Sequence, residues 1–125
     1  MTELFDVIKQ VFESSNVGDC YEAANRIALH RKIPISNTDI KDWTIVHGYV
    51  TGQGSISGVV YGHAWNEYKG LLVADMSAGG KLIMDKGKYY RTGNIKTNRS
   101  SYRIYTVSEA MSMMSKHGHH GPWEI

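Results

Sequence analysis

Three residues of the chain have the side chains needed for nucleophilic attack on a carbonyl: Cys20, His63 and Asp75. Cys20 is the single cysteine, and it lies where a helix should begin, so unpaired backbone N–H groups and the helix dipole favour a thiolate there. A neighbouring histidine would act as a base, and an aspartate beside it would orient the ring and stabilise the imidazolium. These three residue types together predict a nucleophile, a base and an orienting carboxylate.

Each of these residues also has a simpler interpretation. A lone cysteine on an apolar helix face is usually a small buried hydrophobe, and a lone histidine on a strand usually has a structural role. The position of Cys20 at a helix start and the hairpin described below, taken together, favour the catalytic interpretation.

The segment that carries Cys20 is predicted to be a helix over residues 20–31. Asp19 is a good N-cap residue, and Glu22 follows at the third helical position, as in a capping box. The small side chains on one face of this helix allow it to pack closely against a flat surface, and Pro34 prevents its continuation. A first helix is predicted over residues 2–14, where apolar residues recur at helical spacing.

His63 and Asp75 are predicted to lie on the two strands of one hairpin. The strands cover residues 59–68 and 71–77, and Lys69-Gly70 forms the turn. A hairpin centred near residue 69 places His63 directly opposite Asp75, on the same face of the sheet. A slip of one residue would move one of them to the other face.

The remaining elements indicate an α+β domain. Residues 43–50 and 102–107 are predicted strands, and residues 51–58 form a Gly-rich connection. Thr106 and Glu109 predict a second capping box, which opens a C-terminal helix whose buried side holds Val107, Ala110, Met111 and Met114. Helices followed by an antiparallel sheet, in a chain of 125 residues, predict a single domain over 1–125.

Composition and targeting signals bound the cellular setting. No apolar run has membrane-spanning length, and the N-terminal segment carries acids, unlike a secretory signal peptide. One cysteine cannot form an internal disulfide. We therefore expect a cytoplasmic protein that does not bind a membrane; the oligomeric state is left open.

The order of the motifs resembles the transglutaminase-like superfamily of papain-like cysteine enzymes. That family has a G-x-C motif opening a helix, a small residue three positions on, and a basic residue and Ile-Pro near the helix end. The matching residues here are Gly18-Asp19-Cys20, Ala23, Arg31 and Ile33-Pro34. A strand ending in Gly-Tyr, an H-A-W-x-E motif and a D-x-[ST] motif follow as Gly48-Tyr49, residues 63–67 and residues 75–77, so the resemblance covers residues 18–77.

The resemblance implies a papain-like fold in which the Cys-bearing helix packs on an antiparallel sheet. It implies that Cys20 is the nucleophile, His63 the base and Asp75 the orienting residue of a triad, with no metal or organic cofactor. Attack on a protein or peptide-like amide would give a thioester, which water or an amine resolves. We expect a hydrolase (protease, amidase or deamidase) rather than a transferase, because a short domain offers little surface to exclude water and dock a second substrate.

Three further residues are candidates for supporting roles. Asn16 could supply a second oxyanion donor beside the Cys20 N–H, or simply form the turn. A hairpin centred near residue 55 places His47 opposite His63, where it could assist catalysis, bind substrate or line a cleft. Trp65 shares the face of His63, where it could shield the site from water or pack in the core.

A segment rich in lysine and arginine and a cluster of histidines suggest functions other than catalysis. Residues 81–103 hold seven of the 14 lysines and arginines, with three tyrosines and one acid. This segment could hold an acidic partner, and a catalytically silent binding or inhibitor module is the alternative function. Nucleic acid is not expected, because no nucleic-acid motif accompanies the charges, and a solvated loop is favoured. The histidines at 117, 119 and 120 have no cysteine nearby, so an exposed polar tail is favoured over a zinc site.

Overall fold

The computed structural model of the protein describes residues 20–29, 40–75 and 82–125. Several predicted features therefore lie outside the described residues. They are the helix over residues 2–14, Asn16, Gly18-Asp19 with the proposed helix cap, Arg31, Ile33-Pro34 and Ser77.

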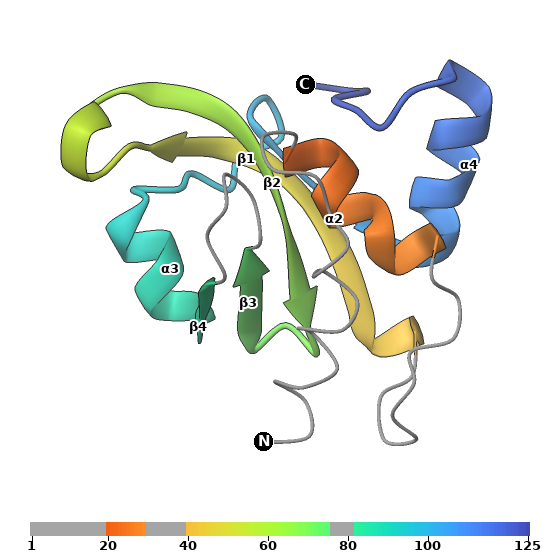
Figure 1. The fold of residues 1–125 in the computed structure, drawn as a ribbon, viewed down its shortest axis with the longest axis horizontal. Coiled ribbons are helices and arrows are strands. Elements are labelled where there is room, and N and C mark those ends of the chain that lie inside the picture. The colour runs from red at the N-terminus through yellow and green to blue at the C-terminus, as the bar shows by residue number, and fades with distance from the viewer. Residues whose placement is uncertain (1–19, 30–39, 76–81) are drawn as a thin grey trace.

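The centre of the fold is a five-stranded sheet in the order β4-β3-β2-β1-β5. Its strands are β1 (Trp43–Thr51), β2 (Val60–Tyr68), β3 (Leu72–Asp75), β4 (Leu82–Asp85) and β5 (Tyr102–Thr106), and each neighbouring pair is antiparallel. Figure 1 shows the long β1–β2 hairpin curving through the molecule, with a 3-10 turn at Gly54–Ile56 near its tip. The predicted antiparallel sheet and the α+β class are confirmed.

Helices cover both faces of this sheet. α2 (Cys20–Leu29) and α4 (Val107–His117) pack on one face, where Ala24, Val107 and Ala110 join a core with Trp43 and Ile45. α3 (Lys86–Thr92) packs on the other face, where Tyr89 meets a second core built on the alternate residues of the strands, Val46, Val50, Trp65 and Val73. Because strand residues alternate between faces, neighbours in sequence belong to different cores.

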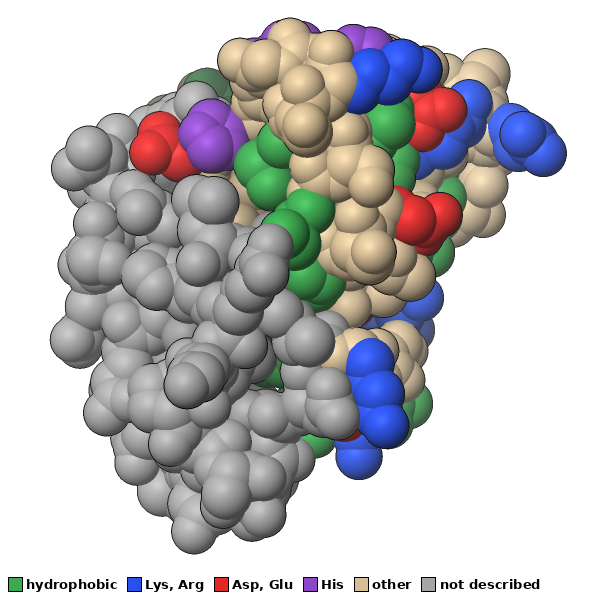
Figure 2. Space-filling model, turned by 90° about the vertical axis from the view of Figure 1, so that its right-hand side faces the viewer, with side chains coloured by type: hydrophobic (Ala, Val, Ile, Leu, Met, Phe, Trp, Pro, Cys, Tyr) green, Lys and Arg blue, Asp and Glu red, His purple; other side chains and the backbone are tan. Residues whose placement is uncertain are grey.

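α4 begins as the sequence predicts. The Thr106 hydroxyl accepts a hydrogen bond from the Glu109 N–H at 3.0 Å, and the Glu109 carboxylate accepts one from the Thr106 N–H at 2.9 Å. This reciprocal pair is a capping box. Figure 2 faces α4 and shows hydrophobic side chains running down the middle of this surface, with charged side chains along its outer side. The helix is therefore amphipathic, with Val107 and Ala110 buried and Met111 and Met114 packed against the core.

The prediction of a solvated loop over residues 81–103 was wrong. The described part of this segment forms β4 and α3, and it buries Tyr89 and Ile95. Asp85 ends β4 and caps α3, since its carboxylate accepts a hydrogen bond from the Lys88 N–H at 3.0 Å. On α3, Lys88 and Arg91 are exposed while Tyr89 faces the sheet, so the charge of the segment alone was a poor guide to its backbone structure.

The C-terminal segment is irregular, as predicted, but it is not an exposed tail. Trp123 packs against the α2–α4 core, with its ring 5.1 Å from that of Tyr105. The amide of Asn25 donates a hydrogen bond to the His120 carbonyl at 2.6 Å, which ties the segment to α2. Burial of the Trp123 ring against apolar neighbours stabilises the packed segment more than the polar histidines around it favour exposure. Within the described ranges, no helix has the length and apolar character needed to cross a membrane.

Candidate active site

The hairpin between β2 and β3 has a register two residues away from the predicted one. Tyr68 pairs with Leu72 and Asn66 with Ala74, so the hairpin is centred on residue 70. Lys69 and Gly70 both have positive φ values, 52° and 67°, and the Leu71 N–H donates to the Tyr68 carbonyl at 2.9 Å. Three residues therefore separate the paired strands. A shift of two residues preserves the face, because the side-chain period of a strand is two.

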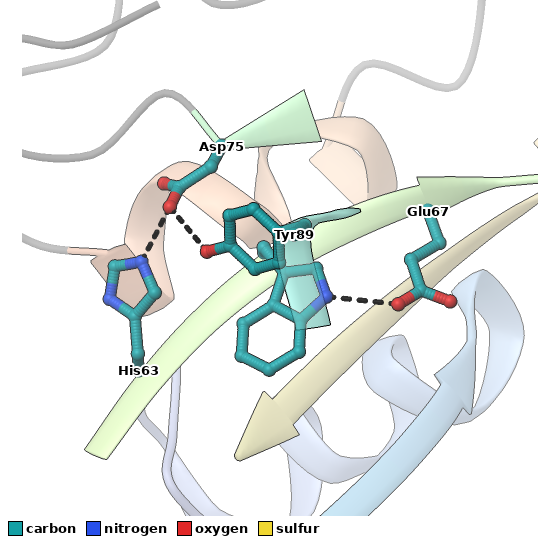
Figure 3. A network of polar contacts seen from close by, with 5 residues as sticks. His63, Glu67, Asp75 and Tyr89 are labelled. Carbon is teal, nitrogen blue, oxygen red and sulfur yellow. Dashed lines mark hydrogen bonds and ion pairs between the residues drawn. The ribbon is translucent and has the colours of Figure 1, made fainter. Parts of the chain in front are cut away.

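His63 and Asp75 meet across this hairpin as diagonal neighbours. The Nε2 atom of His63 lies 2.7 Å from Oδ2 of Asp75, and their side chains are only 7% and 13% exposed. Figure 3 shows the two side chains reaching toward each other from β2 and β3. The predicted contact is therefore present, although the two residues are not directly opposite.

Cys20 is on the other side of the His63 ring. It is the first residue of α2, its side chain is half-buried, and it shares a hydrogen bond with His63. Because Nε2 faces Asp75, Nδ1 is the ring nitrogen available to the thiol, and Figure 3 shows it pointing away from Asp75. Three separate elements, α2, β2 and β3, thus bring the three predicted residues into one chain of contacts.

The charges of this cluster favour a protonated His63. Burial alone lowers the pKa of His63, but the hydrogen bonds to Asp75 and Cys20 and the negative charges of both partners outweigh it, raising the pKa from 6.5 to about 9. A cysteine nucleophile reacts as a thiolate, and a protonated histidine beside it stabilises that negative charge.

Tyr89 is a member of the site that the sequence analysis missed. Its hydroxyl donates a hydrogen bond to Oδ2 of Asp75 at 2.6 Å, the same oxygen that contacts His63 (Figure 3). Burial and the nearby Asp75 charge raise the pKa of Tyr89, so the hydroxyl stays protonated and remains a donor. The available signal was Asp85, a capping residue that starts a helix with Tyr89 on its inner side.

Trp65 shares the face of His63, as predicted, and its ring stacks against the imidazole at 6.0 Å between centroids and 30° between planes. Its indole N–H donates to Oε2 of Glu67 at 3.0 Å. Glu67 is buried, and it is held by the Tyr90 hydroxyl and by Lys86, whose Nζ lies 3.1 Å from Oε1. α3 therefore holds two carboxylates of the sheet, one through Tyr89 and one through Tyr90.

The predicted position of His47 was wrong. Gly48, not His47, lies opposite His63, and His47 pairs with Ala64. The centre of the long hairpin lies half a residue further along than predicted, which shifts the register by one and turns His47 to the α2 face. There it is fully buried among the rings of Tyr21, Tyr105 and Trp123, and burial lowers its pKa to about 4.

The start of α2 offers a donor for an oxyanion. Cys20 is the first residue of this helix, so its backbone N–H is a candidate oxyanion donor. Within the described ranges, no three His, Cys, Asp or Glu side chains gather in a metal-binding arrangement. His119 instead accepts a hydrogen bond from the Gly121 N–H at 3.0 Å.

Comparison with known proteins adds no relative. No protein-family model matches the chain, and neither curated proteins nor solved structures give a significant match. What the protein does must therefore be inferred from the site itself.

Proposed function

We propose that the protein is a cysteine enzyme that hydrolyses an amide or peptide bond through a thioester on Cys20. The observation that carries this proposal is the position of His63, which contacts Cys20 on one side and Asp75 on the other. A structural histidine needs one satisfied partner, whereas a base for a thiol needs both a nucleophile and an orienting group.

The reaction follows from these contacts. The Cys20 sulfur attacks the carbonyl carbon, and the Cys20 N–H stabilises the oxygen that becomes negative. His63 gives its proton to the leaving nitrogen, the C–N bond breaks, and an amine departs from the thioester. Water then loses a proton to His63 and attacks the thioester, which releases a carboxylic acid and restores the thiolate and the imidazolium. Asp75 remains ionised throughout and fixes the ring.

The resemblance of residues 18–77 to the transglutaminase-like superfamily supports the same assignment. We propose that the sheet and its Cys-bearing helix represent the papain-like fold of that superfamily. Water is the proposed acceptor of the acyl group, and an amine is the alternative that the product analysis below tests.

Iodoacetamide labelling tests whether Cys20 is activated, and the chain contains no other cysteine to confuse the result. An ordinary thiol is about 99% protonated at pH 6, so it reacts slowly there. We expect the wild-type protein to label rapidly at this pH, and His63→Ala to label at least ~10-fold more slowly. His119→Ala, which removes an exposed histidine outside the site, is the matched control. Equal rates for all three proteins would contradict the proposal.

Product analysis tests the reaction itself. A peptide mixture is incubated with the protein in H₂¹⁸O, with and without an added primary amine, and read by mass spectrometry. Hydrolysis predicts ¹⁸O in new carboxyl groups that Cys20→Ala abolishes. Incorporation of the amine instead would identify a transferase, and rapid labelling of Cys20 without any product would favour a binding module.

A further inference from the structure

A cleft of about 290 Å³ opens beside His63 and Asp75 on the face of the sheet that carries α3. Its walls come from the end of β1 with the following loop, from β4 and from α3. Ligand pockets usually measure about 300–1,000 Å³, so this cleft is at the small end of that range and has ample room for one large side chain.

The strand register makes the cleft continuous with the candidate active site. Leu82 pairs with Asp75 and Met84 with Val73, so both β4 side chains lie on the face of the triad. Tyr61 of β2 also lines the cleft; it precedes His63 by two residues, and its ring lies 5.6 Å from the imidazole. His63 is itself a lining residue, so a group held in the cleft is adjacent to it.

Large apolar and aromatic side chains form most of the mouth of the cleft, beside the polar Gln53 and Thr92. Ile56, Tyr61 and Leu82 line it and remain 46%, 36% and 38% exposed, although each has a large apolar side chain. Clustered exposed apolar groups of this kind mark binding sites. Among the described lining residues, the charged groups are His63 and Asp75, and they pair with each other. Among these described residues, a charged guest would find no unpaired opposite charge to offset its lost hydration.

The cleft is held open by contacts between its walls. The Thr51 N–H donates to the Gly93 carbonyl at 2.8 Å, and the Gln53 side-chain amide donates to the Thr92 carbonyl at 2.9 Å. These bonds attach the tip of the β1–β2 hairpin to the end of α3. A cleft whose backbone is already fixed binds its ligand with a smaller ordering cost.

We infer that this cleft binds an apolar side chain, of the size of leucine or methionine, from the substrate whose amide bond Cys20 attacks. The substrate class is therefore a peptide with an apolar residue next to the cleaved bond. This inference rests on the proposed function for the role of the site, but the binding itself does not require a reaction.

Methyl-labelled methionine provides a direct test by NMR. The full chain with Cys20→Ala is titrated with the N-methylamides of N-acetylleucine, N-acetylaspartate and N-acetyllysine. We expect the Met84 methyl signal to shift with the leucine compound alone, while the signals of Met113 and Met114 on α4 stay fixed. No shift with the leucine compound, or equal shifts with all three, would overturn the inference.

A pair of leucine variants locates the binding. Leu82→Asn should lower the affinity for the leucine compound by about tenfold, since the apolar surface that Leu82 supplies to the bound side chain is lost. Leu71→Asn is the matched control, because Leu71 is also exposed but does not line the cleft. Equal weakening by both variants would contradict the assignment.

The two proposals fail in different ways. If Cys20 labels rapidly and depends on His63, but the Met84 signal does not respond to the leucine compound, the inference about the cleft is wrong and the proposed function stands. If the Met84 signal responds as expected while labelling is independent of His63, the cleft binds apolar groups and the proposed enzyme is wrong.

Discussion

At the scale of single residues, one oxygen of Asp75 joins two elements of the site. Oδ2 accepts from the Tyr89 hydroxyl and contacts His63 Nε2, so its position depends on β3, β2 and α3 together. A carboxylate held from two sides keeps the imidazole in one orientation, which is the role of the orienting residue in a triad. In the proposed mechanism Tyr89 acts through Asp75 and is a positioning residue.

Replacing Tyr89 by phenylalanine tests this role. The variant keeps the buried ring but leaves Asp75 with one donor fewer, so we expect a loss of about 1–2 kcal/mol in the free energy of unfolding, measured in urea. Because Asp75 then orients His63 less firmly, the iodoacetamide rate at pH 6 should also fall. Tyr90→Phe, which changes the contact with Glu67 instead, is the control. Unchanged labelling in Tyr89→Phe would limit Tyr89 to a packing role.

At the scale of elements, the sequence predicted the helix cap of α4 correctly and the registers of both hairpins incorrectly. The capping box of α4 depends on two residues three positions apart, so Thr106 and Glu109 were sufficient to predict it. A register depends on the length and shape of a turn, which composition does not define. The error of two residues at Lys69-Gly70 kept His63 and Asp75 on one face, whereas the error of one residue in the β1–β2 hairpin moved His47 to the other.

The sequence did not predict α3, because the many charged residues of this segment suggested a solvated loop. The helix nevertheless holds the carboxylates of Asp75 and Glu67. Its N-cap can be tested by Asp85→Ala, which removes the acceptor for the Lys88 N–H. We expect a loss of about 1 kcal/mol in the free energy of unfolding. The labelling rate of Cys20 should fall as well, since Tyr89 lies on this helix. Lys88→Ala changes an exposed neighbour and should leave both measurements unchanged; the same loss in both variants would contradict a capping role.

At the scale of the whole molecule, the two faces of the sheet have separate roles. The α3 face holds Asp75, Tyr89 and the cleft, while the α2–α4 face holds a core closed by the C-terminal segment and its Trp123. The α+β class could be predicted because hydrophobic periodicity is a property of the sequence. The packing of the C-terminal segment could not, because it depends on a contact between Trp123 and residues more than 70 positions away.

His47 lies beside the α2–α4 core and links it to acid stability. Its pKa falls to about 4 in the folded protein, and neither ring nitrogen has a hydrogen-bond partner among the described residues. The unfolded chain binds a proton near pH 6.5, so the free energy of unfolding should decrease as the pH falls from 6.5 toward 4, by about 3 kcal/mol in total. His47→Phe should remove this decrease in urea titrations at several pH values. An identical pH dependence in the variant would show that another group is responsible.

An NMR titration of the His63 ring tests whether His63 lies between Cys20 and Asp75. We expect a pKa of about 9 for His63 in the wild-type protein, and a lower pKa in both Cys20→Ala and Asp75→Asn, since each variant removes a negative partner. A wild-type pKa near the ordinary 6.5 that neither variant changes would contradict this arrangement.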